Sequence, residues 1–304
     1  MGDYSFNANL QTFNGIPMIS LDKDFSGSTY FVDGNSGSDG GKGHGTSLIK
    51  PYKTLAYAAA VSHADIARGS DRWARRNRIY IMGDDFTEDL VALPQKTDII
   101  GLGSSDNYPM ACIRGNHAPV DSAVACRFYN VRFRPAASAD MWTLASTTGA
   151  GLEFWNCLWE AQYSTFTAVS GIDSTACVNW RVMNCEFTGA FSANYIDIGA
   201  GVATNVEIAY NKMKGSAVNG IMTTGAVTVS ASHYGEIHHN FIACPGIVLD
   251  TQASSVFYAY DNVGISAAAL GSNSYVIDLT MAARNCLTGN DISVYVPSLT
   301  SVAA

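Results

Sequence analysis

Charged residues are scarce in this chain. Only 14% of its 304 residues are charged, and 18 basic against 26 acidic residues give a formal net charge of -8. A nucleic-acid-binding protein needs a basic surface that neutralises phosphates, so we expect no nucleic-acid partner. With 47% hydrophobic residues the chain is still too apolar to be disordered, and it must fold around a large core.

Long hydrophobic runs and targeting signals are missing too. No stretch approaches the roughly 18 consecutive apolar residues of a membrane span. The first residues, MGDYSFNANL, have neither the basic nor the apolar segment of a secretory signal. The sequence therefore predicts a protein made in the cytoplasm, with no membrane partner.

The cysteines show no C-x-x-C spacing. Their number is odd, and small apolar residues scattered in this way are usually free, buried thiols. We expect neither a disulfide nor a zinc site, and no cofactor. The seven cysteines are Cys112, Cys126, Cys157, Cys177, Cys185, Cys244 and Cys286.

An asparagine recurs along most of the chain at intervals of roughly 26 residues. It follows short segments that alternate as strands do, such as VEIAY before Asn211. The interval is too long for a heptad and too variable for an α-solenoid, so it indicates loops of variable length between fixed strands. The recurrent asparagines are Asn130, Asn156, Asn184, Asn211, Asn240, Asn262 and Asn285.

A second apolar strand often follows a glycine in each unit, as in GIDS at 171–174. Such coils, each pairing with the next at about 4.8 Å, describe an all-β fold, a single-stranded right-handed parallel β-helix of roughly eight coils. We expect the asparagines to stack as a hydrogen-bonded ladder at one turn. Arg127, Glu153 and Arg181, each three residues before an asparagine, should form an ion-pair ladder beside it.

The segment before the repeats predicts a capped start. KTLAYAAAVSHADIARG, from Lys53 to Gly69, has the pattern of a short amphipathic helix, which would cover the open end of the β-helix as an N-terminal capping α-helix. The chain then divides into an extended N-terminal arm (1–28), a strand, Gly-rich loop and capping helix (29–77), and the parallel β-helix (78–304).

The run TYFVDGNSGSDGGKGHGTSLIKPYKTLAYAAA, followed by IYIMGDDFTEDL and TDIIGLG, resembles the opening of pectin-lyase-like right-handed β-helix proteins. In that family an extended strand, a Gly/Asp/Asn loop, a P-[FY]-K-T motif and a capping helix precede the first coil. The resemblance implies the fold. The family contains pectate lyases, polygalacturonases, bacteriophage tailspikes and non-enzymatic virion proteins, so function must be argued from a site.

Asp173 and Asp197 are the best candidates for a catalytic pair. If their strands stack, the carboxylates lie about 5 Å apart on one face, which suits a glycosidase. In this fold, however, register alone stacks like residues, so a purely structural role stays the stronger alternative. The catalytic signatures of the family's enzymes do not occur on the predicted coils.

Two groups could be metal sites. Asp33, Asn35 and Asp39 alternate like calcium ligands, although a Gly-rich turn with side-chain hydrogen bonds to its own backbone is the favoured interpretation. His238 and His239 are adjacent, so in a strand they would point to opposite faces and could not share a metal. We assign no metal.

Two segments could dock a partner. The only basic cluster, next to several acidic residues, could form local salt bridges or a docking patch. The N-terminal arm is too apolar to be a tail without contacts to other surfaces. The residues concerned are Arg72, Arg75, Arg76, Phe6, Leu10 and Phe13.

The resemblance and the missing enzyme signatures imply a non-enzymatic structural protein of a bacteriophage virion, such as a head decoration, tailspike-like or fibre-like protein. Its expected partners are capsid or tail proteins, a surface polysaccharide and further copies of itself in a homotrimer. A virion protein leaves the cell by lysis and needs no signal peptide. The alternative is a polysaccharide lyase or glycoside hydrolase acting on acidic polysaccharide.

Overall fold

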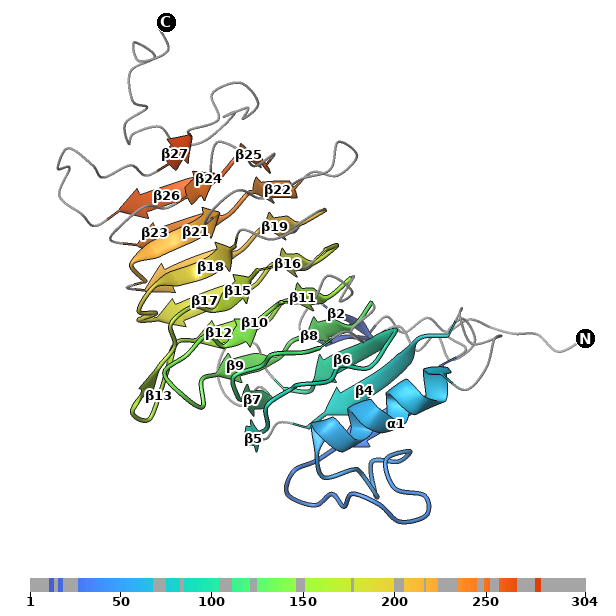
Figure 1. The fold of residues 1–304 in the computed structure, drawn as a ribbon. Helices are drawn as coiled ribbons and strands as arrows, with labels where there is room; N and C mark the ends of the chain where they lie inside the picture. The colour runs from blue at the N-terminus through green and yellow to red at the C-terminus, as the bar shows by residue number, and fades with distance from the viewer. Residues whose placement is uncertain are drawn as a thin grey trace, which may run out of the picture.

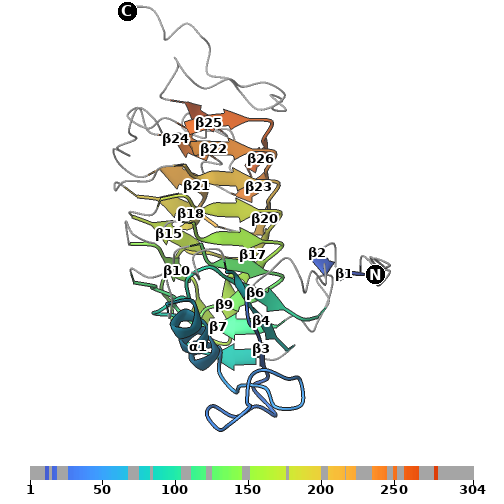
Figure 2. The ribbon, with the colours of Figure 1, turned by 90° about the vertical axis from the view of Figure 1, so that its right-hand side faces the viewer.

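The strands wind into a right-handed parallel β-helix, which confirms the predicted fold class (Figures 1 and 2). Parallel pairing joins the coils along three sheets, so the coils from residue 127 onward have a third strand beyond the two that the sequence indicated. The computed structural model describes residues 11–13, 16–18, 27–67, 75–82, 85–103, 111–120, 125–145, 151–175, 178–199, 205–215, 217–223, 235–244, 249–251, 257–266 and 277–279.

Each coil passes from the first sheet to the second and, from residue 127 onward, then to the third. The first sheet contains β3 (Thr29–Val32), β4 (Asn77–Ile81), β6 (Thr97–Gly101), β8 (Arg127–Tyr129), β11 (Glu153–Trp155), β16 (Arg181–Met183), β19 (Glu207–Ala209), β22 (Gly235–His238) and β25 (Phe257–Tyr260). The second contains β5 (Asp85–Thr87), β7 (Cys112–Arg114), β9 (Arg132–Arg134), β12 (Leu158–Glu160), β17 (Glu186–Gly189), β20 (Lys212–Gly215), β23 (Phe241–Cys244) and β26 (Val263–Ser266). The third contains β10 (Trp142–Thr143), β15 (Ile172–Ser174), β18 (Asn194–Ile198), β21 (Asn219–Thr223), β24 (Leu249–Thr251) and β27 (Ile277–Leu279).

Two antiparallel pairs lie outside these sheets. A hairpin of β13 (Gln162–Tyr163) and β14 (Phe166–Thr167) projects from one coil (Figure 1). In the arm, β1 (Gln11–Phe13) pairs with β2 (Ile16–Met18), so Phe13 belongs to a strand pair. The other candidate docking residues Phe6, Leu10 and Arg72 lie outside the described residues.

The predicted helix is α1 (Leu55–Ala67), which lies beside β3 and β4 at the N-terminal end (Figure 2). Its first turn is capped twice. The Thr54 hydroxyl accepts the N–H of Tyr57 at 3.2 Å, and the Glu88 carboxylate accepts the N–H of Leu55 at 2.9 Å. These caps satisfy N–H groups that have no partner inside the helix, which explains the threonine of the opening motif.

The Gly-rich loop protects the outer edge of the first sheet. Phe31 of β3 donates its N–H to the Gly45 carbonyl, and Tyr52 donates its N–H to the Phe31 carbonyl, both at 2.8 Å. An uncovered strand edge would invite pairing with another chain, so the loop closes this end of the sheet. Because β3 also pairs with β4, residues on both sides of the predicted boundary at 77/78 share one sheet.

The interior is a column of aromatic and aliphatic side chains. The Trp159 and Phe187 rings stack across neighbouring coils, 4.6 Å apart and 4° from parallel. Stacked rings bury much apolar area in a narrow coil, which is how this chain forms its core. As predicted, the described cysteines are free and buried, namely Cys112, Cys126, Cys157, Cys185 and Cys244; Cys177 and Cys286 lie outside the described residues.

The recurrent asparagines form two columns, so the prediction of one continuous ladder is wrong. The register pairs Arg181 with Glu207, which aligns Asn184 with Tyr210 and leaves Asn211 one position further along. The corner column between the first two sheets has positive φ at every member: Asn130, Asn156, Asn184, Tyr210, His239 and Asp261. Asparagine suits this left-handed turn best, but Tyr, His and Asp replace it in the later coils.

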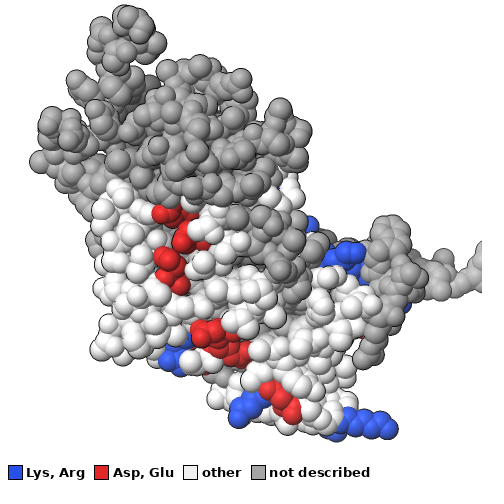
Figure 3. Space-filling model, in the orientation of Figure 1, with Lys and Arg blue, Asp and Glu red and all other residues white. Residues whose placement is uncertain are grey.

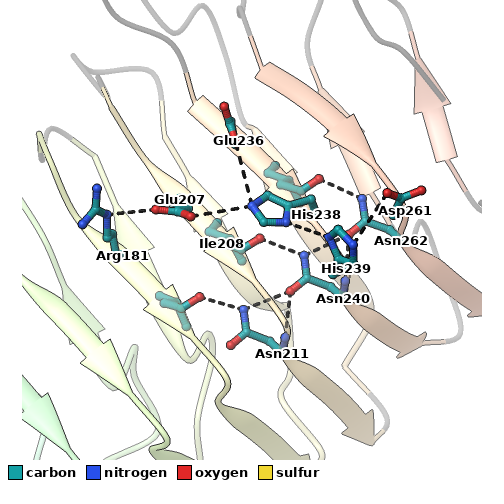
Figure 4. A network of polar contacts seen from close by, with 12 residues as sticks. Arg181, Glu207, Ile208, Asn211, Glu236, His238, His239, Asn240, Asp261 and Asn262 are labelled. Atoms are coloured by element: carbon teal, nitrogen blue, oxygen red, sulfur yellow. Dashed lines mark hydrogen bonds and ion pairs between the residues drawn. The ribbon is translucent and has the colours of Figure 1, made fainter. Parts of the chain in front are cut away.

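The inner column is a true ladder only in the later coils. Asn211, Asn240 and Asn262 are buried, and each side-chain amide donates to a backbone carbonyl of the preceding coil at 2.8 Å. Asn211 also donates its backbone N–H to the Oδ1 of Asn240 at 3.0 Å (Figure 4). In the earlier coils Cys157 and Cys185 take this position, and Asn285 lies outside the described residues.

Candidate ligand-binding groove and acidic face

A groove of about 430 Å³ follows the turn between the first and second sheets. The corner residue and the first residue of the second-sheet strand lie two positions apart. Both line the groove, and they form its two walls. One wall consists of Asn156, Asn184, Tyr210 and His239. The other consists of Leu158, Glu186, Lys212 and Phe241.

The floor of the groove is the inner column. Cys157, Cys185 and Asn211 lie between the two walls and point inward. Neighbouring coils are about 4.8 Å apart, so the groove offers one pair of wall residues per coil at that pitch. It runs parallel to the long axis of the β-helix and is suited to an extended chain-like ligand.

Tyr210 and His239 form an aromatic platform on one wall. Their rings stack 4.8 Å apart at 26°, and Tyr210 is 53% exposed. Below the platform the side chain of Asn184 donates to that of Asn156 at 3.4 Å. The wall therefore presents amides at one end and a flat aromatic surface at the other.

The opposite wall carries charges of both signs. Glu186 pairs with Lys214 at 3.5 Å. Lys212 is exposed and makes no ion pair with any residue that the structure describes. Its ammonium group is therefore available to a ligand in the groove.

Behind the platform, His238 and His239 meet at the corner. Their Nδ1 atoms are 2.9 Å apart, and His238 is only 6% exposed. The expectation that adjacent histidines point to opposite faces is wrong here. Because His239 adopts φ 54°, the chain turns at this residue and brings its ring back against that of His238.

Carboxylates flank both ends of this histidine pair (Figure 4). The Nε2 of His238 lies 3.7 Å from Glu207 and 3.8 Å from Glu236. The Nε2 of His239 lies 3.6 Å from Asp261. The pair thus bridges acids from three successive coils.

The predicted ion-pair ladder leads up to this pair. Arg127 contacts Glu153 at 3.2 Å, Glu153 contacts Arg181 at 3.8 Å, and Arg181 contacts Glu207 at 2.9 Å. The alternation fails at the next coil, where Glu207 is in register with Glu236. At that point two carboxylates are neighbours, and His238 lies between them.

The sequence-predicted pair Asp173 and Asp197 is in register on adjacent strands β15 and β18. Burial, together with the nearby Asp140 and Asp197 carboxylates, raises the pKa of Asp173 to about 6. The Asp197 carboxylate accepts the side-chain N–H of Asn194 at 2.9 Å. Figure 3 shows acidic side chains gathered in a few groups on the face that is turned to the viewer.

The candidate calcium loop uses its carboxylates within the protein. Asp33 accepts the N–H of Asn35 at 2.9 Å, and its hydrogen bond with Ser36 lowers its pKa. Asp39 accepts the N–H groups of Lys53 and Thr54. This is the turn with side-chain hydrogen bonds that the sequence favoured. No cluster of three metal-binding side chains occurs in the described ranges.

The basic cluster is partly engaged in local contacts. Arg76 forms an ion pair with Asp98 at 2.7 Å and donates to the Ala125 carbonyl at 3.0 Å. This holds the start of β4 against the next coils. Arg75 is partly buried.

No family model, curated protein or solved structure matches this chain. The fold is therefore established by the strand register alone. The groove and the Asp173 and Asp197 pair are the features that bear on function. Among the described residues no helix has the length and apolarity to cross a bilayer.

The groove was not predicted from the sequence. Tyr210 and His239 stand at unrelated positions until the register aligns them with asparagines of earlier coils, and Lys212 until it aligns with Glu186. A second corner was missed in the same way: Asn205 donates to Asn179 at 2.8 Å, and both have φ 55°. The signal available was the spacing of these asparagines, one coil apart, before the first-sheet strands.

Proposed function

We propose that this protein is a non-enzymatic structural protein of a bacteriophage particle that binds a glycan in the groove. The observation that carries the glycan assignment is the exposed Tyr210 and His239 platform beside the Asn156 and Asn184 amides. The resemblance of residues 29–60 to phage and enzyme β-helix proteins supports the setting in a virion.

A glycan fits the chemistry of the walls. Sugar rings present an apolar face that packs on aromatic rings, and hydroxyl groups that pair with amides, carboxylates and ammonium groups. A peptide usually binds such scaffolds by adding a strand to a sheet edge. The groove has no such edge, because its corner residues lie between two fully paired sheets.

Glycan binding is tested with Tyr210→Ala in the full chain. An array of bacterial surface oligosaccharides should identify a ligand, and the substitution should weaken its binding about tenfold or more, because the stacking surface is lost. Phe166→Ala is the matched control, since Phe166 is a 38% exposed aromatic outside the groove. Equal weakening by both variants, or no bound oligosaccharide, would overturn the assignment.

The virion setting is tested in the particle. Mass spectrometry of purified particles from the source should detect the chain as a stoichiometric component together with its capsid or tail partners. Absence of the chain from such particles would refute the setting but leave glycan binding open.

A second candidate function has an observation in its favour. Asp173 and Asp197 stack in register, and the raised pKa of Asp173 keeps part of its population protonated near neutral pH. One protonated and one ionised carboxyl group is the combination that a glycoside hydrolase uses. Release of reducing ends from acidic polysaccharides by the wild type, abolished in Asp173→Asn, would favour the enzyme over the structural protein.

A further inference from the structure

The histidine pair beside the platform restricts where protons can lie. Its close contact joins two Nδ1 atoms at 2.9 Å, so one of them must donate and the other accept. The two outer nitrogens each face carboxylates, which are acceptors. All three contacts are favourable only if both outer nitrogens and one inner nitrogen carry hydrogen.

Two neutral rings cannot meet this requirement. They have two hydrogens for three positions, so with the inner contact kept, one outer Nε2 presents a lone pair to a carboxylate. If that ring is His238, the lone pair faces both Glu207 and Glu236; if it is His239, it faces Asp261. In either arrangement a nitrogen lone pair faces a negatively charged carboxylate in a partly buried site, and the two repel each other.

Two charged rings fail for the opposite reason. Both Nδ1 atoms would then carry hydrogen at 2.9 Å, and the inner contact would become a repulsion between two donors. A single excess proton is the only state in which the inner and outer contacts are all satisfied. It also places a positive charge between Glu207 and Glu236, at the coil where the alternation of the ladder fails.

We propose that the His238 and His239 pair carries one shared proton, and that this proton regulates the platform of the glycan groove. The groups that contact the pair are Glu207 from β19, which also contacts Arg181 of β16, Glu236 from β22, Asp261 after β25 and the Tyr210 ring. The proposal rests on the proposed function for its link to the ligand.

The link to the groove is direct. His239 belongs to the wall, and its ring stacks on Tyr210, while His238 meets the same Tyr210 ring edge-on at 5.5 Å. Loss of the proton leaves a lone pair against a carboxylate, and the ring concerned must rotate to avoid it. Rotation of either histidine disturbs the stacked surface on which a sugar would pack.

The proton count can be measured without any glycan. In the full chain with 15N-labelled histidine, nitrogen chemical shifts report the protonation of each ring nitrogen. We expect His238 with both nitrogens protonated and His239 with only Nε2 protonated, which is one excess proton for the pair. Two independent protons, or none, would overturn the proposal.

The link to binding is measured by the pH dependence of affinity for the tightest-binding oligosaccharide of the array. We expect at least a threefold loss from pH 5.5 to 8.5, absent in His238→Gln, which cannot take up the proton. His44→Gln, in the loop beside β3, is the matched control and should keep the wild-type profile. A wild-type affinity that does not depend on pH overturns the regulation but leaves glycan binding intact. No binding at any pH overturns the proposed function, and the nitrogen shifts then still decide the proton count.

Discussion

At the scale of single residues, His117 shows how far burial can shift the pKa of an imidazole. Its Nδ1 accepts the N–H of Leu90 at 3.2 Å, and its ring packs 4.5 Å from that of Trp142. Burial lowers its pKa to about 3. The buried ring therefore stays neutral at pH values where it would be charged in the unfolded chain.

His117 should consequently make the fold sensitive to acid. Its contribution is complete above the unfolded pKa of about 6.5 and is lost as pH falls from there towards 3, because only the unfolded chain takes up the proton. Between pH 7 and pH 4 this costs about 3 kcal/mol. Urea unfolding should show His117→Phe losing less stability over that interval than the wild type; equal losses would mean that the ring is hydrated.

Asp173 should act in the opposite direction. Its pKa is raised from the ordinary value of 3.8 to about 6, so its destabilising effect is absent below about pH 4, grows as pH rises from there to 6, and is complete above 6. Asp173→Asn is expected to raise the melting temperature at pH 7.5 and to change it little at pH 4. Asp197→Asn is the comparison, since it disturbs the contact with Asn194 instead. A decrease at pH 7.5 for Asp173→Asn would show that its charge is stabilised by a group outside the described residues.

At the scale of structural elements, the inner asparagine ladder should stabilise the later coils. Asn211→Leu removes a buried amide that donates to the Val182 carbonyl and to the Oδ1 of Asn240 and that accepts the N–H of Cys185, which should cost roughly 1 to 3 kcal/mol. Asn184→Gly is the control, because Asn184 is exposed, lies in the corner column and has a positive φ that glycine adopts without strain. Denaturant unfolding that ranks the two variants equally would contradict the two-column register.

The strands were predictable from sequence because alternation and turn spacing repeat in every coil. The register slip between Asn184 and Asn211 was harder to see, because asparagine occupies either of two adjacent positions that both suit it: the positive-φ corner and the inner ladder. A signal was present. Glu153 stands three residues before its asparagine, whereas Glu207 stands four before Asn211.

The groove depends on this slip, which explains why sequence reasoning missed it. Only after the shift do Tyr210 and His239 fall in the corner column, where their backbone turns and their rings face outward. By contrast, the stacking of Asp173 on Asp197 followed from two similar segments, YID and GID, without any shift. Repetition is thus predictable from the sequence, whereas departures from it, such as the slip that forms the groove, are not.

At the scale of the whole molecule, the thiols test the packing of the column. Burial raises the pKa of Cys126, and of Cys185 well above its ordinary value, so both should resist alkylation in the native state. Denatured protein should titrate about seven thiols without reductant, and native protein far fewer. Recovery of five or fewer from denatured protein would reveal a disulfide.

The last prediction is a homotrimer anchored through the N-terminal arm. A single β-helix exposes long faces, and at 14% charge this chain has few ionic groups to solvate them, so columns packed side by side would bury the excess apolar surface. Three columns around an axis close such an assembly, and the apolar arm of residues 1–28 could lie across a neighbouring copy or a capsid or tail protein. Light scattering should give a trimer for the full chain. A monomer would refute trimer formation in isolation, and a shortened chain beginning at Ser28 that still enters particles would refute the anchoring role of the arm.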